Sequence, residues 1–476
     1  MLFNSTQFIF IFLPVVLIIY FGLNKLKLVK ISTGWLVFAS LFFYSYWSLD
    51  YLALILSSIV FNYSIGQTLL SNKLKINKKA LTAFGIIGNV LLLIYFKYFN
   101  FLIENLNAVF HQHFNFMELM LPLAISFFTF QQIAYIVDTY KGKTKEIDFL
   151  TYALFVCFFP HLISGPIVRY EEEVPQIQNL KKRFINWKNL SKGLFLFSIG
   201  LFKKVVIADM LAGWALTGFS DASNLSMVEA WITILSYTFQ IFFDFSGYTD
   251  MALGIGLMFN FDIAQNFNNP YISKDIQEFW RRWHITLSRW LRDYLYIPLG
   301  GNRCGNFNTY KNIFLTFLIG GIWHGASWTY IIWGILHGVG SVINRIWKNL
   351  NVTIPNWSAW LLTFIYINIT WVYFGAKRVS DANQILLSAI NPLVFDVPKI
   401  YFPFVRFRTT GHGFDLLVLI LLPLFIYFVF NNKFRNFIDN FKPQLNYSIF
   451  IVALMIVSLY NLLKPDYASS FIYFNF

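Results

Sequence analysis

Long apolar runs recur along the chain, and short polar segments that carry most of the charge separate them. Runs long enough, or nearly long enough, to cross a bilayer as helices are 8–23, 33–47, 51–70, 80–100, 118–137, 313–343, 358–376, 414–430 and 447–463. This pattern predicts an all-α, polytopic membrane protein with about 11 to 14 membrane segments, some of them tilted or re-entrant.

The composition agrees with this pattern. Of the 476 residues, 57% are hydrophobic and 13% are charged, so a water-soluble domain would lack the polar residues to cover its surface. No basic residue precedes the first apolar run and no small-residue cleavage site follows it, so we expect no removable signal peptide. The lipid bilayer is the expected surrounding of the chain.

The charges in the loops predict an orientation. Lysines cluster after the first apolar run and again after the third, as Lys25, Lys27 and Lys30 and then as Lys73, Lys75, Lys78 and Lys79. Short loops rich in lysine and arginine stay in the cytoplasm, which predicts an extracytoplasmic N-terminus. The same rule accounts for the net charge of +14, so we expect no nucleic acid partner.

No linker, low-complexity tract or long charged stretch interrupts the chain, so residues 1–476 are predicted to form a single membrane domain. The two cysteines, Cys157 and Cys304, lie far apart in different surroundings. That spacing favours neither a disulfide framework nor a zinc site, and no metal ion is expected.

The apolar segment 149–167 has basic residues on both sides, at 141–145 and at 181–183, so both of its ends are expected in the cytoplasm. Pro160, Gly165 and Pro166 interrupt it. These features predict a re-entrant hairpin, which a membrane protein tolerates where protein or water surrounds the irregular backbone. Two short tilted spans would satisfy the same charges.

A basic and aromatic segment covers residues 272–312, as is typical of a membrane interface. Between 277 and 296 the arginines and the apolar side chains separate onto two faces of a helix: Arg281, Arg282, Arg289 and Arg292 on one, and Trp280, Trp283, His284, Leu287, Trp290, Leu291 and Tyr294 on the other. We interpret 277–296 as an amphipathic helix at the cytoplasmic boundary, with His284 facing protein or lipid rather than water. A plain interfacial anchor explains the two faces equally well, but not the histidine.

Residues 313–345 are predicted to form core helices, and His324 lies in their apolar part, well away from Lys311 and Arg345. An ionisable group at such depth usually faces a cavity or a partner. Burial disfavours the imidazolium cation, so a neutral ring would be able to accept a proton, as a general base must. A hydrogen-bonded core histidine is the alternative.

His324 and His337 each precede the second glycine of a G-x-x-x-G pattern, which predicts close helix packing at both places. The stretch 229–261 contains Asp244 and Asp250, which need a cationic or hydrogen-bonding partner if they are buried, and one of the interfacial arginines is a candidate. A structural tie between helices would explain these carboxylates as well. His111 and His113 fall in a polar loop and are expected to be solvated.

Several blocks of the sequence, in this order and spacing, resemble the membrane-bound O-acyltransferase (MBOAT) family, in particular its bacterial branch of alginate, peptidoglycan and D-alanyl transfer proteins. They are 125–132 with Asp138, Phe159-Pro160-His161 with Ser164-Gly165-Pro166, 244–250, 266–271, 280–284 and 323–328. The resemblance implies a ring of tilted helices around a thinned centre, with a tunnel that joins the two membrane faces.

The resemblance also implies roles for residues. His324 matches the catalytic histidine of the family, and His284 matches a second position that is asparagine or aspartate in many eukaryotic members. Seven further residues lie in the same motifs and are candidates for substrate binding: Asp244, Trp280, Arg281, Arg282, Trp283, Trp323 and Ser327. Relatives of this kind take an acyl group from a cytoplasmic thioester, and for this chain we expect acetyl-CoA, or alternatively an acyl carrier protein thioester.

The expected mechanism combines both arguments. Interfacial arginines attract the phosphates of the donor, and neutral His324 accepts the proton of a hydroxyl that attacks the thioester carbonyl, while His284 orients the donor or stabilises developing charge. A covalent acyl-histidine is the alternative. The expected location is the bacterial cytoplasmic (inner) membrane, and an extracytoplasmic SGNH-type acetyltransferase or esterase is the expected partner.

The acceptor is expected to be a cell-envelope polysaccharide. We favour O-acetylation of peptidoglycan, because the sequence as a whole resembles the peptidoglycan proteins of this branch. Its composition, rich in Phe, Ile, Asn and Lys, is also typical of an AT-rich genome. O-acetylation of alginate or another exopolysaccharide, and D-alanyl transfer to teichoic acid, stay open as alternatives. A membrane transporter is the competing class, since re-entrant segments and buried histidines also line substrate pathways, but we find no inverted internal repeat.

Overall fold

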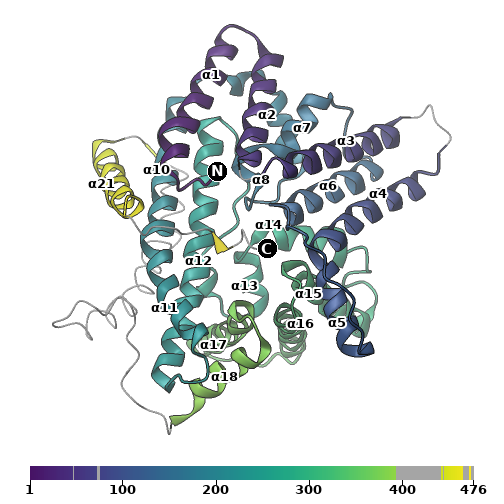
Figure 1. Ribbon diagram of the computed structural model, residues 1–476, viewed down its shortest axis with the longest axis vertical. Helices are drawn as coiled ribbons and strands as arrows, with labels where there is room; N and C mark the ends of the chain where they lie inside the picture. Colours follow the sequence, from purple (N-terminus) through teal and green to yellow (C-terminus); the bar gives the residue numbers. More distant parts are fainter. Residues whose placement is uncertain (47, 72–75, 393–440, 443, 465–470, 473–476) are drawn as a thin grey trace. The chain divides into compact units, whose positions relative to one another are not determined.

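The computed structural model describes residues 1–46, 48–71, 76–392, 441–442, 444–464 and 471–472. The predicted apolar run 414–430 and the lysines Lys73 and Lys75 lie outside these residues. Throughout the part of the chain that is described, regular secondary structure is helical and no strand occurs, which confirms the all-α prediction (Figure 1).

Contacts along the backbone divide the chain into two compact units. The first comprises 1–201, 248–265 and 443–476, and the second comprises 202–247 and 266–442. Each unit draws on separate stretches of sequence, and helix α12 (Met227–Met258) contributes residues to both.

The first unit is built from helices of the N-terminal 201 residues and one helix near the C-terminus. Its elements are η1 (Phe8–Phe12), α1 (Leu13–Lys25), α2 (Val29–Ser45), α3 (Asp50–Leu70), α4 (Lys78–Leu93), η2 (Ile94–Tyr98), α5 (Phe99–Phe110), α6 (Ile125–Tyr140), α7 (Phe149–Cys157), α8 (Phe159–Leu162), α9 (Tyr170–Gln178), η3 (Leu180–Arg183), α10 (Trp187–Phe202) and α21 (Leu445–Leu462). Helices α3, α4 and α6 pack against one another, as Figure 1 shows.

Amide and hydroxyl groups join the helices of this unit where apolar packing alone would not fix their register. Asn62 on α3 and Asn89 on α4 exchange side-chain hydrogen bonds of 2.7 and 3.2 Å. Gln132 on α6 donates to the hydroxyl of Ser58 on α3 at 2.8 Å and accepts from Tyr152 on α7 at 3.2 Å. Buried polar pairs of this kind specify which helix faces meet inside a membrane protein.

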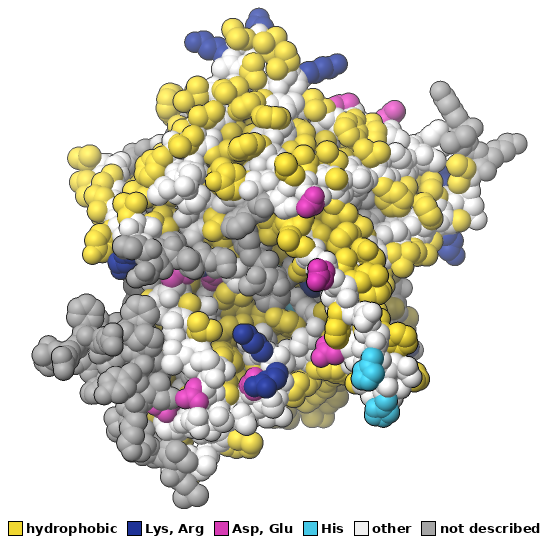
Figure 2. All heavy atoms as spheres, in the orientation of Figure 1, with side chains coloured by type: hydrophobic (Ala, Val, Ile, Leu, Met, Phe, Trp, Pro, Cys, Tyr) yellow, Lys and Arg dark blue, Asp and Glu magenta, His cyan; other side chains and the backbone are white. Residues whose placement is uncertain are grey.

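Five helical stretches of the described chain are long and apolar enough to cross a membrane: Phe8–Lys25, Asp50–Leu70, Lys78–Phe110, Asn356–Gly375 and Leu445–Leu462. Large apolar side chains such as Ile18 on α1, Phe38 on α2 and Phe84 on α4 are exposed, and hydrophobic side chains cover much of the face shown in Figure 2. A surface of this composition suits lipid rather than water. The chain is a multi-pass membrane protein.

The segment 149–167 is interrupted as its prolines and glycine predict. Asp148 caps α7 by accepting from the backbone N–H of Thr151 at 3.1 Å, and α7 ends at Cys157 before the short helix α8. A Cβ added to Gly165 would lie 2.3 Å from Cα of His161, so only glycine fits this turn. The irregular backbone is buried in protein, which is the condition under which a membrane protein tolerates it.

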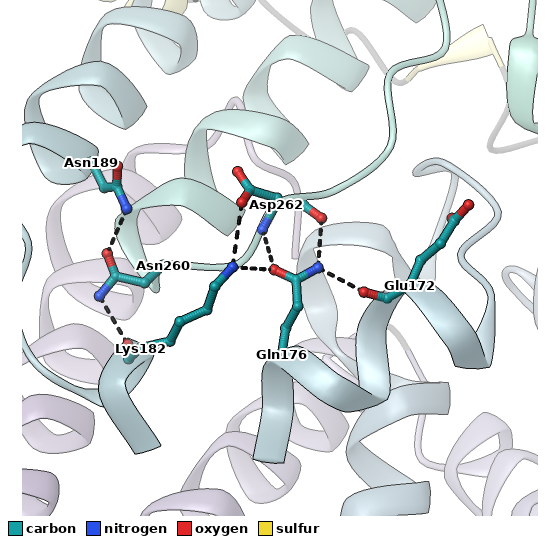
Figure 3. A network of polar contacts seen from close by, with 6 residues as sticks. All are labelled: Glu172, Gln176, Lys182, Asn189, Asn260 and Asp262. Carbon is teal, nitrogen blue, oxygen red and sulfur yellow. Dashed lines mark hydrogen bonds and ion pairs between the residues drawn. The ribbon is translucent and has the colours of Figure 1, made fainter. Parts of the chain in front are cut away.

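The polar interval that follows ties α9 to the end of α12. Gln176 lies at the centre of the network in Figure 3: its carboxamide oxygen accepts from the backbone N–H of Asp262 at 2.9 Å and from Lys182, and its nitrogen donates to the backbone oxygens of Asp262 and Glu172. Asn260 donates to the backbone oxygens of Lys182 and Phe184. This network fixes the chain where α12 ends and the segment leading to the second unit begins.

The second unit contains the remaining elements. They are η4 (Lys203–Ala208), α11 (Asp209–Ser220), residues 227–247 of α12, η5 (Pro270–Ile272), α13 (Ile276–Arg282), α14 (Ile285–Leu291), η6 (Arg292–Tyr296), α15 (Gly305–His324), α16 (Trp328–Asn349), α17 (Asn356–Gly375) and α18 (Val379–Ile390). Helices α15 and α16 form a closely packed hairpin, and α16 also contacts α13 and α17.

Glycines make the close approach of α15 and α16 possible. A Cβ on Gly321 would lie 2.5 Å from the backbone oxygen of Tyr330, and a Cβ on Gly334 would lie 2.8 Å from the backbone oxygen of Phe317. The prediction of close helix packing at the two G-x-x-x-G patterns is confirmed.

Candidate active site

His284 lies at a break between two short helices, and this corrects the prediction of one continuous helix over 277–296. Helix α13 ends at Arg282, His284 has a left-handed backbone with φ of 42°, and α14 begins at Ile285. The two-faced pattern still predicted burial correctly, because Trp280, Trp283, Leu287 and the histidine are all buried.

The break exists because a separate segment supplies hydrogen bonds that the helix would otherwise make. The side-chain oxygen of Asn266 accepts from the backbone N–H of Thr286 at 3.2 Å and from its hydroxyl at 2.6 Å, and the backbone oxygen of Asn266 accepts from Ile285. On the other side of the break, Asn268 donates its backbone N–H to the oxygen of Arg282 at 2.9 Å. Residues 266–268 therefore clamp both sides of the turn that carries His284.

The imidazole of His284 is fully buried against aromatic rings. Phe245 on α12 contacts it edge-on, with ring centroids 4.8 Å apart, and Phe267 lies 5.0 Å from Phe245 and 5.0 Å from Trp283. With the backbone clamped and the ring enclosed, the position of this histidine is defined by the protein and not by solvent.

His324 is the last residue of α15, so the apolar segment predicted around it is divided into two helices at residues 325–327. Its ring is 3% exposed and contacts three aromatic side chains, with centroid distances of 4.9 Å to Trp333, 5.0 Å to Trp323 and 5.1 Å to Phe374.

His337 on α16 binds a residue of the His284 segment. Its Nδ1 accepts the indole N–H of Trp280 at 3.1 Å, and its ring lies 4.5 Å from that of Trp333. Trp371 on α17 contacts both Trp283, at 4.9 Å, and Trp333, at 6.0 Å. One continuous aromatic cluster therefore connects Trp283, which precedes His284 in the chain, to Trp333, which contacts the ring of His324.

The other predicted substrate-binding residues differ in what they contact. Trp280, Trp283 and Trp323 belong to the aromatic cluster. Arg282 forms an ion pair with Glu278 at 2.8 Å and donates a hydrogen bond to the backbone oxygen of Asn268. Arg281 is exposed. Ser327 caps α16 by accepting from the backbone N–H of Thr329.

Asp244 pairs with a cation that sequence reasoning missed. The Nζ atom of Lys204 lies 2.6 Å from Asp244 and 2.8 Å from Asp209, and both Lys204 and Asp244 have side chains only 2% exposed. The sequence analysis had named the interfacial arginines as candidate partners of this carboxylate. Lys204 belongs to a π-helical turn, η4, in an otherwise apolar stretch, and a lysine there is the signal that could have found the pair.

The first unit contains a second buried pair that was not predicted. His161 Nε2 and Glu173 Oε1 lie 2.9 Å apart, with side chains 2% and 6% exposed. The sequence motif Phe159-Pro160-His161 includes the histidine, but the sequence did not indicate that its partner lies on α9.

Comparisons with known proteins identify the family of the chain. The model of the membrane-bound O-acyltransferase family matches residues 141–379, which include His161, His284, His324 and the aromatic cluster. The chain is 48% identical over 421 residues to a peptidoglycan O-acetyltransferase of Helicobacter pylori, covering 82% of this chain and 80% of that protein. It is 43% identical over 389 residues to a probable alginate O-acetylase AlgI of Pseudomonas aeruginosa, covering 80% and 73%.

A more distant relative is a teichoic acid D-alanyltransferase of Streptococcus thermophilus, 32% identical over 244 residues that cover 49% of this chain and 59% of that protein. The helical membrane fold and these relatives define an acyltransferase of the membrane. The chain belongs to the membrane-bound O-acyltransferase family, and the resemblance seen in its sequence motifs is confirmed.

Proposed function

We propose that the protein transfers acetyl groups from acetyl-CoA for the O-acetylation of peptidoglycan, and that it acts in the bacterial cytoplasmic membrane. The identity of 48% with a peptidoglycan O-acetyltransferase over most of both chains carries the choice of acceptor. O-acetylation of alginate is the second candidate, because the relatives named for that polymer reach 43%.

In the proposed reaction His324 is the general base. Its ring is buried at the end of α15 among aromatic side chains, where water does not compete for its nitrogen atoms. It accepts the proton of an incoming hydroxyl as the hydroxyl oxygen attacks the thioester carbonyl carbon. His284, held by the Asn266 clamp, orients the donor or hydrogen-bonds the charge that develops.

The exposed arginine Arg281 is the best candidate among the interfacial arginines for binding the phosphates of the donor. Arg282 already binds Glu278, and Arg292 binds Asp293 at 2.6 Å. Arg281 forms no ion pair with a carboxylate among the described residues. A guanidinium that is exposed and next to the buried cluster can bind phosphate oxygens in bidentate fashion.

The test compares single-residue variants of purified protein reconstituted in liposomes, with radiolabelled acetyl-CoA as donor. His324→Ala is expected to abolish acetyl transfer and acetyl-CoA hydrolysis while the thermal midpoint in detergent stays near that of the wild type. His113→Ala is the matched control, because it removes an imidazole that is exposed in a loop. Wild-type transfer by His324→Ala would disprove the base role.

The acceptor and the partner are tested in cells. Deleting the gene in its host should remove O-acetyl esters from muramic acid, measured by mass spectrometry, and deleting the gene of an extracytoplasmic SGNH-type esterase relative should do the same. Loss of acetyl esters from an exopolysaccharide, with muramic acid unaffected, would favour the second candidate.

The proposed orientation places the turn between α1 and α2 in the cytoplasm, since Lys27 lies in this turn and Lys25 and Lys30 flank it. With Cys304 replaced by serine, a Leu26→Cys variant provides an exposed thiol in this turn. A membrane-impermeant maleimide is expected to label it in inverted vesicles and not in spheroplasts. Labelling only in spheroplasts would show that the chain has the opposite orientation.

A further inference from the structure

Among the described residues, His337, Trp333 and Trp371 of the aromatic cluster each carry a buried N–H donor that has no acceptor. Because Nδ1 of His337 accepts the N–H of Trp280, a neutral His337 ring carries its proton on Nε2. This Nε2 atom, and the indole nitrogens of Trp333 and Trp371, have no hydrogen-bond partner among the described residues. All three side chains are at most 1% exposed.

These donors lie on neighbouring rings next to His324. The centroid of Trp333 is 4.5 Å from that of His337, 6.0 Å from that of Trp371 and 4.9 Å from that of His324. His337 and Trp371 are 6.4 Å apart. The three rings that carry these donors therefore pack beside one another, and the Trp333 ring also contacts the proposed base.

A buried N–H group without an acceptor destabilises a fold, and most native proteins keep very few of them. The same group becomes useful when a ligand supplies the acceptor, since donors fixed in a water-poor site stabilise negative charge on oxygen without having to reorient. All three groups are hydrogen-bond donors, so they can bind an oxygen atom that accepts hydrogen bonds. They cannot hydrogen-bond to a ligand group that is itself a donor.

We propose that His337 Nε2–H and the indole N–H groups of Trp333 and Trp371 bind the carbonyl oxygen of the acyl thioester during transfer. This inference rests on the proposed function and assigns the part of the site that holds the reacting carbonyl. As the hydroxyl oxygen bonds to the carbonyl carbon, its proton passes to His324 and the carbonyl electron pair moves onto oxygen, where the donors stabilise it. The pair then returns, the C–S bond breaks, and the thiolate takes the proton from His324.

The decisive variant removes a donor and keeps the shape. Replacing Trp333 by β-(3-benzothienyl)alanine substitutes sulfur for the indole N–H in a ring of nearly the same size. We expect kcat to fall at least about tenfold with KM within about twofold, because the lost interaction strengthens only as charge develops. The thermal midpoint should stay unchanged or rise, since no hydrogen bond within the protein is lost.

Trp360 provides the matched control, because its indole N–H donates to the backbone oxygen of Tyr271 at 2.9 Å. The same replacement there is expected to lower the thermal midpoint and leave kcat unchanged. If the Trp333 replacement leaves kcat at the wild-type value, the donor role of Trp333 is disproved. Its N–H group then binds water or no ligand during transfer.

Two variants of His337 separate its two nitrogen atoms. Asparagine places an oxygen near the position of Nδ1 and keeps an acceptor for Trp280, whereas glutamine places its amide near Nε2 and keeps a donor there. We expect His337→Gln to retain more transfer activity than His337→Asn. Higher activity in the asparagine variant would show that His337 acts only by holding Trp280, and would overturn its assignment as a donor.

Failure of this inference is distinguishable from failure of the proposed function. If His324→Ala is inactive while the Trp333 replacement is fully active, only the donor cluster is rejected. If His324→Ala is active, the proposed base is rejected, whatever the Trp333 variant shows.

Discussion

Asn266 holds Thr286 through a single carboxamide oxygen, which accepts both the backbone N–H at 3.2 Å and the hydroxyl at 2.6 Å. The two residues belong to segments on either side of α13, and the turn that carries His284 lies between them in the chain. A hydrogen-bonded clamp thus fixes a left-handed residue that the local sequence alone would place inside a helix.

Removing this clamp should loosen the site. Asn266→Ala deletes the acceptor of two buried hydrogen bonds, so we expect the free energy of unfolding to fall by about 1–3 kcal/mol and acetyl transfer to fall with it. Thr286→Val removes only the hydroxyl bond and should lose about 1 kcal/mol. Thermal midpoints in detergent measure the difference, with Asn461→Ala as a control whose amide, among the described residues, bonds only to Val457 and Lys464, at the end of α21. Equal midpoints for all three variants would contradict the clamp.

The backbone of His284 predicts how its substitutions separate fold from chemistry. Asparagine adopts the left-handed region more readily than alanine, so His284→Asn should keep the wild-type midpoint while His284→Ala lowers it. Both variants lose the imidazole, and transfer should fall about 100-fold or more in each if the ring takes part in the reaction. Full activity of the asparagine variant would mean that the imidazole is dispensable.

Lys204 neutralises two carboxylates, and its removal should be among the most damaging single changes. Lys204→Met leaves Asp244 buried without this cation, for which we expect a loss of about 3–5 kcal/mol in the free energy of unfolding. The double variant Lys204→Met with Asp244→Asn should recover part of the loss, because the buried negative charge of Asp244 is then removed. Expression yield and thermal midpoint report both, with Lys188→Met as an exposed control. No recovery in the double variant would argue against the pair.

Two glycines give opposite expectations for the same substitution. Gly334→Ala would place a Cβ 2.8 Å from the oxygen of Phe317 and 3.0 Å from Cα of Gly321, so α15 and α16 must separate. We expect a loss of about 1–3 kcal/mol and reduced activity, since α15 ends in His324. Gly22→Ala meets nothing within 4 Å and should stabilise α1 by about 0.5–1 kcal/mol. A neutral Gly334→Ala variant would show that the hairpin adapts.

The N-terminus of α13 predicts a pH dependence of stability. Burial acts to raise the pKa of Asp275, but hydrogen bonds from Lys348, the backbone N–H of Glu278 and Asn344 outweigh it and hold the pKa below its usual value of 3.8. A carboxyl whose pKa is lowered in the folded state contributes stability above its unfolded-state pKa, and this contribution is lost as pH falls through the folded-state pKa.

The measurement compares thermal midpoints of wild type and Asp275→Asn between pH 7 and pH 3. The wild type should be more stable at pH 7, and the difference should be constant down to about pH 4 and shrink below it. A difference that does not change over this range would assign the effect to the shape of the side chain rather than to its charge.

The sequence alone determined the class of the protein, an all-α protein that crosses the membrane several times. A run of apolar residues long enough to cross a bilayer has few other stable solutions, because every backbone polar group in lipid needs a partner within the segment. The two-faced pattern around His284 likewise determined which side chains are buried, since burial follows the local period of apolar residues. Its motifs also determined the family.

Tertiary structure decided what depends on contacts between distant segments. The break at His284 arises because Asn266 and Asn268 replace the hydrogen bonds of a continuous helix, and no local pattern in 277–296 records that competition. The partner of Asp244 was decided by the packing that brings Lys204 beside it. The unpaired donors of His337, Trp333 and Trp371 were decided in the same way, because a side chain's hydrogen-bond partners depend on which helices meet.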